Sequence, residues 1–441
     1  MSRSIEQLES MVADLLAEAR KQGASAAEAA VSSSAGLSLT VRLSEVETVE
    51  HTRDQGLSIT VYFGKRKGSA NTTDLKPAAL REAVNKACTI ARYTSEDDCA
   101  GLADPDLLAR DYPDLDLYHP WNIDTERAKE LALKAEQAAR DHDRRISNSE
   151  GATLNTQSGS FIYGNSHGFV GGYPTTRHSL SCVVLAQDGD SMQRDYWYDS
   201  RRDWHELLSP DAIGRKAAAN AVAKLNARKL GTCQAPVIFR ADIAPHLLHS
   251  LTGALRGHAQ YRQSSFLLDS LQQEIFPNWV SIQEDPHIPK GLSSAPFDNQ
   301  GVATRPKNII RDGVIQTYLL DSYSACKLNM KSTGNAGGVR NLAITTGDLS
   351  LEQMLREMGK GLLVTELMGQ GVNAVTGDYS RGAAGFWVEN GEIQYPVEEI
   401  TIAGNLKDMY RQLLAVGSDT DIPGSTHTGS WWVEQMTIAG N

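Results

Sequence analysis

The chain has 441 residues, of which 41% are hydrophobic and 22% charged, and its formal net charge is −11. A chain of this length exceeds what one hydrophobic core usually organises, so we expect a soluble globular protein of two or three domains. The negative charge repels a phosphate backbone, and the longest basic run, residues 64–67, is typical of a solvated turn. We therefore expect no direct binding of nucleic acid.

The first 110 residues alternate between helical and strand patterns. Apolar residues at helical spacing predict helices over 5–16 and 77–91, the second with Pro77 in its first turn, where the missing N–H costs little. Between these helices, short alternating runs predict three strands of an antiparallel meander, and these runs lie at 37–41, 46–49 and 57–63. The Asp- and Pro-rich stretch 103–120 is typical of a connection between domains.

The rest of the chain becomes richer in strands. We expect helices over 124–138 and 209–228, with a β-rich region at 146–185 between them. A boundary at 230–236 is followed by a strand from Val237, a helix that starts with Pro245, and short strands and turns with one clear helix at 351–358. The sequence Thr-Ile-Ala-Gly-Asn occurs at 401–405 and again at 437–441, which suggests related sheet edges, although turn chemistry and chance explain it equally well.

These patterns predict an α+β fold. An N-terminal α/β region with an antiparallel meander and flanking helices precedes a β-rich C-terminal domain. We place the domains at 1–110, 111–230 and 231–441, and the middle segment could pack with the first as one domain.

Five cysteines are spread along the chain without a Cys-x-x-Cys pair, namely Cys88, Cys99, Cys182, Cys233 and Cys326. Their odd number and wide spacing argue against a disulfide scaffold and against a zinc site made of cysteines alone. The N-terminus carries acid where a signal peptide needs a basic start, and no stretch approaches the roughly 20 apolar residues of a membrane span. We expect a cytoplasmic protein that does not bind a membrane.

The helix that starts with Pro245 looks like the metal-binding helix of a zinc peptidase without its reactive groups. Such an enzyme needs two histidines as zinc ligands and a glutamate that deprotonates the metal-bound water. Here Ser250, which has no basic lone pair at neutral pH, follows His249, and Ala254, which cannot bind a metal, follows Gly253. These four positions predict a degenerate zinc motif with no catalytic residue and no bound metal.

One metal site remains possible on this helix. His246 and His249 are three residues apart and share a helix face, so both could reach one ion, with an acidic residue such as Asp242 as a further ligand. His258 points elsewhere if the helix continues, because nine residues at about 100° each bring it to the opposite side. In a pattern with histidines five apart, a glycine before the second one permits the distortion that lets them converge, and Gly253 keeps that glycine.

Three other motifs resemble active sites and fail on their surroundings. His205-Glu206 begins like a zinc motif, but Ser209-Pro210 starts the next helix, so the pair precedes a helix. Ser166 fits the Gly-x-Ser-x-Gly pattern of a nucleophile elbow, but the residues after Gly168 cannot start a helix, so a tight turn is expected. The loop 369–374 resembles a dinucleotide-binding loop and also lacks the following helix.

A group of glycines alternates with strand residues late in the chain: Gly369, Gly371, Gly377, Gly382 and Gly385. Positions without side chains let another backbone come close, so an extended peptide could add to a sheet edge there through main-chain hydrogen bonds. Bulges and bends in a twisted β-domain explain the same glycines equally well.

The chain resembles the PmbA/TldD metallopeptidase family, and most closely its TldE/PmbA branch. The resemblance is carried by the degenerate helix and by the blocks Gly164–Gly168, Pro296–Gly301, Lys331–Asn335, Val375–Gly391 and Tyr395–Asn405. It implies a cytoplasmic bacterial subunit that pairs with a zinc-bearing TldD-type subunit and helps to cleave unfolded peptides, among them antibiotic-peptide precursors and an antitoxin. The TldD subunits also use a late cysteine ligand, whereas residues 423–428 of this chain contain none.

The resemblance leaves the role of the isolated chain to be tested. We expect a silent subunit whose second half forms the partner interface and part of the peptide channel, with the zinc in the TldD partner. Alone, the chain is expected to form a homodimer through the surface meant for its partner. The alternatives are an autonomous metallopeptidase that uses His246 and His249, and a non-enzymatic binding protein that acts on gyrase or an antitoxin.

Overall fold

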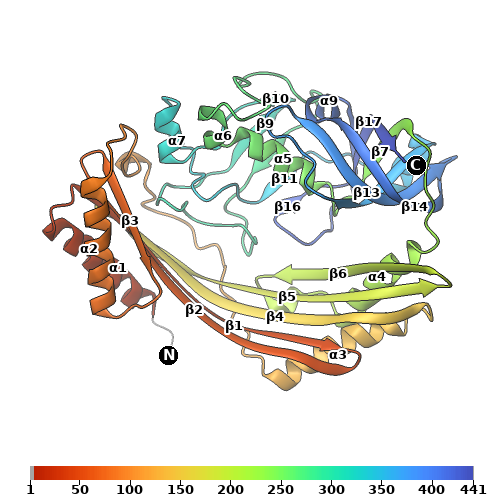
Figure 1. Ribbon diagram of the computed structural model, residues 1–441, viewed down its shortest axis with the longest axis horizontal. Helices are drawn as coiled ribbons and strands as arrows, with labels where there is room; N and C mark the ends of the chain where they lie inside the picture. Colours follow the sequence, from red (N-terminus) through yellow and green to blue (C-terminus); the bar gives the residue numbers. More distant parts are fainter. Residues whose placement is uncertain (1–3, 441) are drawn as a thin grey trace.

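The structure is a computed structural model that describes residues 4–440. A long, curved antiparallel sheet faces a second body built mostly of shorter strands (Figure 1). The α+β class expected from the sequence is confirmed, with antiparallel strands and flanking helices first and a β-rich C-terminal part after them. No helix in the described part of the chain is long and apolar enough to cross a membrane.

The first sheet has six strands in the order β3-β2-β1-β4-β5-β6, all antiparallel to their neighbours. The strands are β1 (Ala26–Arg42), β2 (Glu45–Phe63), β3 (Arg66–Thr72), β4 (Ile146–Asn165), β5 (Val170–Asp188) and β6 (Ser191–Arg201). Both the first and the middle predicted domains contribute strands to this one sheet. The expected strands at 46–49 and 57–63 are wrong as separate elements, because both lie in the single strand β2.

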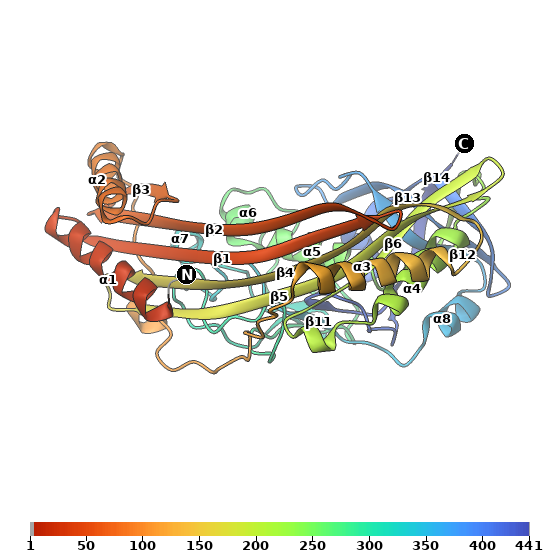
Figure 2. The ribbon, with the colours of Figure 1, turned by 90° about the horizontal axis from the view of Figure 1, so that it is seen from below.

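Four helices cover the outer face of this sheet in two pairs: α1 (Ile5–Lys21) with α2 (Pro77–Tyr93), and α3 (Thr125–Arg140) with α4 (Pro210–Ala223). Figure 2 shows α1 at one end of the sheet and α3 and α4 at the other. α1 starts with a capping box in which Ser4 and Gln7 bond each other's backbone N–H groups. The helix expected over 209–228 ends earlier, at Ala223.

Each helix pair has its own hydrophobic core against the sheet. The core under α1 and α2 includes Val31 of β1 and Ile162 of β4, whereas the core under α3 and α4 includes Leu39 of β1 and Leu154 of β4. Between these cores the strands carry small or polar residues, at 32–36 in β1 and 157–160 in β4. A hollow of about 860 Å³ lies over this middle band of the sheet.

Two buried polar side chains stabilise the first sheet, Glu136 at the β1–β2 turn and His178 in the middle of β5. Glu136 is 1% exposed, and its carboxylate accepts the N–H groups of Leu43 and Ser44 at 2.8 Å each, which holds the β1–β2 turn in its left-handed conformation. His178 is fully buried, with Nδ1 2.8 Å from Thr156 Oγ1 and Nε2 2.9 Å from a backbone carbonyl oxygen. Burial lowers the pKa of His178 below its usual 6.5.

Part of β2 forms an open edge of the first sheet. β3 pairs only with residues 57–63 of β2, so in the described chain residues 45–56 have a strand partner on one side alone. This edge is acidic, with three glutamates and one aspartate, and a β-bulge lies near its start. Charges and bulges both discourage an edge strand from pairing with another chain.

The second body contains a ring of strands. Its six-stranded sheet has the order β14-β13-β12-β7-β17-β15, and an added pairing of β14 with β17 closes it. The strands are β7 (Cys233–Phe239), β12 (Gly361–Met368), β13 (Asp378–Glu389), β14 (Glu392–Asn405), β15 (Leu413–Val416) and β17 (Trp431–Ala439). The two copies of Thr-Ile-Ala-Gly-Asn are the segments that meet, because residues 401–403 pair with 437–439; Asn441 itself lies outside the described residues.

A five-stranded sheet and five helices complete the second body. The sheet has the order β10-β9-β8-β11-β16, with β8 (Ile282–Glu284), β9 (Lys307–Arg311), β10 (Val314–Ile315), β11 (Leu342–Ile344) and β16 (Thr426–His427). The helices are α5 (Pro245–Leu255), α6 (Gly257–Tyr261), α7 (Ser322–Lys327), α8 (Leu351–Met358) and α9 (Leu406–Arg411). The predicted helix at 351–358 is confirmed, whereas the expected boundary at 230–236 lies partly inside β7.

Covalent and ionic contacts tie the two bodies together. Lys224 Nζ, just after α4, lies 2.8 Å from an Asp195 carboxylate oxygen of β6 and 2.6 Å from one of Glu366 in β12. A disulfide joins Cys99 to Cys326. The wide spacing of the cysteines argued against a disulfide scaffold, and it gave no sign of this single pairing, because distance along the sequence does not limit distance in the fold.

Candidate functional site

The four positions predicted to form a degenerate zinc motif lie on α5, which follows β7 in the second body. Leu247, Leu248 and Leu251 are buried in the main core, and this apolar face fixes the rotation of the helix. α5 ends at Leu255 because Arg256 is extended, with φ −64° and ψ 139°, and α6 then begins. The helix therefore does not continue to His258, which belongs to α6.

His246 and His249 lie on the exposed face of α5. Their ring centroids are 6.4 Å apart, so the structure does bring these two predicted residues together. Desolvation by the surrounding chain lowers the pKa of both imidazoles. The positive charges of Arg381 and Arg256 lower the pKa of His246 and His249 further, so the neutral forms predominate at pH 7.

The other two motif positions are occupied in ways that do not suit a metal. Ser250 Oγ donates to the carbonyl oxygen of His246 at 3.1 Å, one turn earlier in the same helix. Ala254 is 3% exposed and belongs to the main core, so its side chain points away from the histidine face. Its carbonyl oxygen accepts hydrogen bonds from Gln260 Nε2 and Ser265 Oγ, both at 2.7 Å.

Further ligands for a metal on α5 are also engaged or missing. Asp242 is held by Arg240, whose Nε and Nη2 donate to its two carboxylate oxygens at 2.6 and 2.7 Å. The chain just after residues 423–428 comes close to the segment before α5, since Ser430 Oγ accepts the N–H of Ala241 at 3.0 Å, but residues 423–430 supply no cysteine. Among residues 4–440, no three His, Cys, Asp or Glu side chains are grouped to hold a metal ion. The described residues around α5 therefore do not offer the ligand set of a catalytic zinc.

Arg381 of β13 adds a positive charge that acts on His246 of α5 and that no sequence pattern indicates. Arg381 acts electrostatically on His246, and its Nε is buried without a hydrogen-bond partner among the described residues. The hydroxyl of Tyr379, two residues earlier, is also buried and unpartnered in that range. A positive charge near enough to lower the pKa of His246 also opposes the binding of a metal cation there. Only the fold reveals this role, because the sequence gives Arg381 no motif.

The late glycines lie in and before β13. The chain itself fills the space where side chains would be: Gly371 contacts the backbone of Ser380, and Gly385 contacts the carbonyl of Leu363. β13 pairs with β12 on one side and with β14 on the other, so Gly382 and Gly385 offer no edge to a peptide. Gly369 has open space around it in the described chain, and peptide contact at these glycines stays a prediction.

The three motifs whose surroundings do not suit an active site lie elsewhere in the fold. Ser166 lies in the turn between β4 and β5, where its Oγ accepts the N–H of Ala27 at 3.0 Å, so the expected turn is confirmed. His205 is on a short 3₁₀ segment (Trp204–Glu206) before α4, with its Nδ1 2.8 Å from an Asp203 carboxylate oxygen. The loop at 369–374 leads into β13 and not into a helix.

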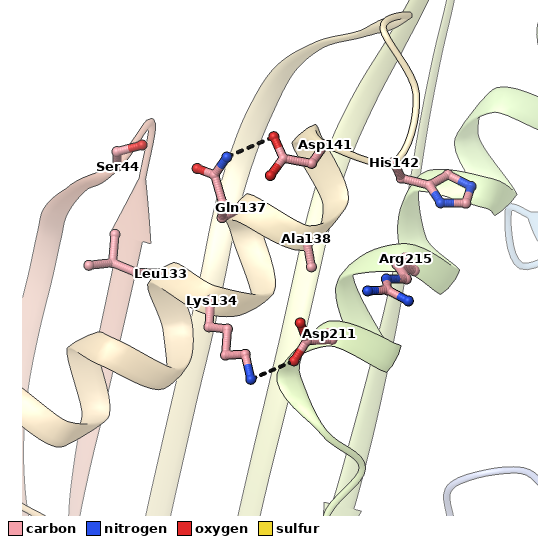
Figure 3. Close-up of a pocket in the computed structure, with 9 residues that line it drawn as sticks. All are labelled: Ser44, Leu133, Lys134, Gln137, Ala138, Asp141, His142, Asp211 and Arg215. Atoms are coloured by element: carbon pink, nitrogen blue, oxygen red, sulfur yellow. Dashed lines mark hydrogen bonds and ion pairs between the residues drawn. The ribbon is translucent and has the colours of Figure 1, made fainter.

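A further pocket lies on the helix-covered side of the first sheet, away from the motif helix. It has a volume of about 870 Å³ and is lined by side chains of α3, α4 and the β1–β2 turn (Figure 3). Lys134 pairs with Asp211 across it at 2.8 Å, and Gln137 bonds Asp141 at 2.7 Å. Because Lys134 and Asp211 neutralise each other across it, this pocket does not point to chemistry.

Comparisons with known proteins cover nearly the whole chain. Three family profiles match: PmbA/TldA metallopeptidase domain 1 at residues 27–91, the central domain at 118–225 and the C-terminal domain at 232–440. "Metalloprotease PmbA" of Escherichia coli O157:H7 is 53% identical over 96% of this chain and 94% of its own length. "Metalloprotease TldD homolog" of Haemophilus influenzae is 20% identical over 84% and 80%. The fold matches a crystal structure of a proposed modulator of DNA gyrase from Bacteroides thetaiotaomicron, with a TM-score of 0.93, 29% identity and 99% of both chains covered.

Proposed function

Because the chain belongs to the PmbA/TldD family of metallopeptidases, we propose that it is a non-catalytic subunit of the TldE/PmbA type. In this proposal a TldD-type partner carries the zinc, the base and the attacking water, and the complex cleaves unfolded peptides in the cytoplasm. The identity of 53% to a PmbA protein and 20% to a TldD homologue supports the subunit type.

One observation carries the proposal: the motif helix cannot assemble a metal site. Ala254 replaces the second histidine and points into the core, and Ser250 bonds its own helix. Arg381 adds a positive charge that acts on His246. A zinc peptidase needs at least three protein ligands around an open coordination position, and α5 offers only His246 and His249.

The partner and substrate surfaces are also proposals. The second half of the chain forms the interface with the TldD-type subunit and one wall of the peptide channel, and Gly369 is the glycine best placed to admit a peptide backbone. In the absence of that subunit, the same surface pairs two copies of this chain.

Zinc content per chain tests the proposal directly. The full chain, purified alone and without a metal-binding tag, is measured by elemental mass spectrometry, and we expect a ratio near zero. Mixed with a TldD-type subunit, it should raise the chelator-sensitive cleavage of an unfolded, fluorescently labelled peptide above that of either chain alone. A ratio near one, with cleavage by the isolated chain that a chelator stops, would establish an autonomous enzyme.

Relatives described as modulators of DNA gyrase favour one further candidate, a binding protein without peptidase function. Capture of gyrase or an antitoxin by the isolated chain at low micromolar concentration would support that role. Under our proposal, the purified chain alone binds neither.

A further inference from the structure

The disulfide joins two parts of the fold that are 227 residues apart in the sequence. Cys99 lies in the stretch after α2, beside the first sheet, and Cys326 lies in α7 of the second body, with their Cα atoms 5.5 Å apart. This separation is usual for a disulfide. Closing or opening this bond therefore changes the attachment between the two bodies.

Polar contacts around the disulfide hold the same two segments together. Asp97 accepts hydrogen bonds from Tyr323 Oη at 2.7 Å and from Lys327 Nζ at 2.9 Å. The bond from Tyr323 has the larger effect and the bond from Lys327 the next, and they lower the pKa of Asp97 to about 2. The contacts keep Cys99 and Cys326 close before any covalent bond forms, so the thiols are positioned to react with each other.

The two cysteines are also reachable from solvent. Cys326 is exposed and Cys99 half-buried, whereas Cys88 and Cys182 are buried. Burial raises the pKa of the Cys88 thiol and raises that of Cys182 to about 12. Because the thiolate is the reactive form, thiol chemistry is directed to Cys99 and Cys326 and away from the buried pair.

α7 connects this bond to the degenerate motif helix. Gly257 of α6 packs so closely on Ser324 of α7 that a side chain at 257 would collide with it. Tyr261 of α6 and Tyr323 of α7 also pack against each other, with their ring centroids 5.8 Å apart. α6 follows directly on α5, so the disulfide restrains the helix pair that carries His246 and His249.

We propose that Cys99 and Cys326 form a reversible redox site that locks the first sheet to the second body. The oxidant is a low-molecular-weight disulfide of the glutathione class. The Cys326 thiolate attacks one sulfur of it, forming a mixed disulfide and releasing one glutathione thiolate. The Cys99 thiolate then attacks the Cys326 sulfur and releases the second glutathione, so two protein thiols are oxidised and one glutathione disulfide is reduced.

Counting reactive thiols tests the chemistry. The full chain is reduced, desalted, incubated with oxidised glutathione, denatured and alkylated, and its intact mass is measured. We expect the number of alkylated cysteines to fall from five to three and peptide mapping to find Cys99 linked to Cys326 within one chain. Reduced glutathione should restore all five. Cys233→Ser should still form the link and Cys326→Ser should not.

Five alkylated cysteines after oxidation, or a link between two chains, would overturn the proposal. Amide hydrogen exchange tests the locking function separately, because it follows the opening of each segment. We expect exchange in residues 322–327 to be at least threefold slower in the oxidised protein than in the reduced one. The same rate in both forms would show that the bond locks nothing, and the double variant Cys99→Ser/Cys326→Ser should not respond to glutathione.

Discussion

Placing the missing zinc-motif residues on α5 should lower the stability of the fold and should not create an active zinc site. The change is Ala254→His, alone and together with Ser250→Glu, which rebuilds the residues of the active pattern. Ala254 is 3% exposed and lies among the main-core side chains, so an imidazole there has to displace its neighbours. Overpacking of a well-packed core costs about 1–3 kcal/mol, and burying an unpaired ring N–H costs about 1–3 kcal/mol more.

We therefore expect Ala254→His to lower the free energy of unfolding by about 2–6 kcal/mol, and the melting temperature by at least several degrees. The matched control is Gly253→Ala, one residue earlier in the same helix. A methyl group at 253 meets no atom of the described chain within 4 Å, and alanine is favoured over glycine in a helix by about 0.5–1 kcal/mol. Ser250→Glu alone should change stability little, because Ser250 is only half-buried.

Calorimetry and elemental mass spectrometry on the same samples decide the matter. The reasoning requires that the double variant melts below the wild type and holds well under one zinc per chain. A double variant that melts as the wild type does, binds one zinc and cleaves a peptide in a chelator-sensitive way would refute it. That result would mean that position 254 can turn toward His249, contrary to the burial seen here.

Three further substitutions test other parts of the structure. Gly385→Ala should destabilise the protein by more than 2 kcal/mol in urea unfolding, because the added methyl group collides with a backbone carbonyl of β12, whereas Gly231→Ala, in open space, should change stability by less than about 0.5 kcal/mol. His178→Gln should reduce the dependence of the free energy of unfolding on pH between pH 7 and pH 5. Because the native pKa of His178 is lowered, the unfolded chain binds more protons below pH 6.5, and the wild type loses stability as the pH falls. The same slope in the variant and the wild type would contradict this. Glu136→Gln should lower the free energy of unfolding by about 1–3 kcal/mol in calorimetry, because one of the two N–H groups of the β1–β2 turn loses its acceptor. The exposed Glu130→Gln is the control and should leave the free energy of unfolding almost unchanged. Equal effects of the two substitutions would contradict the role assigned to Glu136.

Helices with clear amphipathic spacing could be predicted from the sequence, and long strands could not. The spacing of apolar residues located α1, α2 and α8, since each buries one face. β2 was divided in two because residues 50–56 show no alternation of polar and apolar residues. The structure explains this: that part of β2 is the open edge, exposed on both faces, so burial imposes no pattern there.

The sequence identified the residues of the degenerate motif but not their surroundings. The loss of a ligand at Ala254 is a matter of chemistry and needs no coordinates. That Ala254 points into the core, that Arg381 acts electrostatically on His246 and that Cys99 meets Cys326 all depend on how distant segments come together. No local pattern encodes such contacts.

The two cores under the first sheet share their strands, and this has a consequence for folding. β1 carries Val31 in one core and Leu39 in the other, and β4 carries Ile162 and Leu154 in the same two cores. A slip of one residue between β1 and β4 would turn both sets of side chains to the wrong face at once. The small or polar residues between the two cores do little to fix the register of β1 against β4. Each core therefore helps to hold the strands in the register that the other core requires.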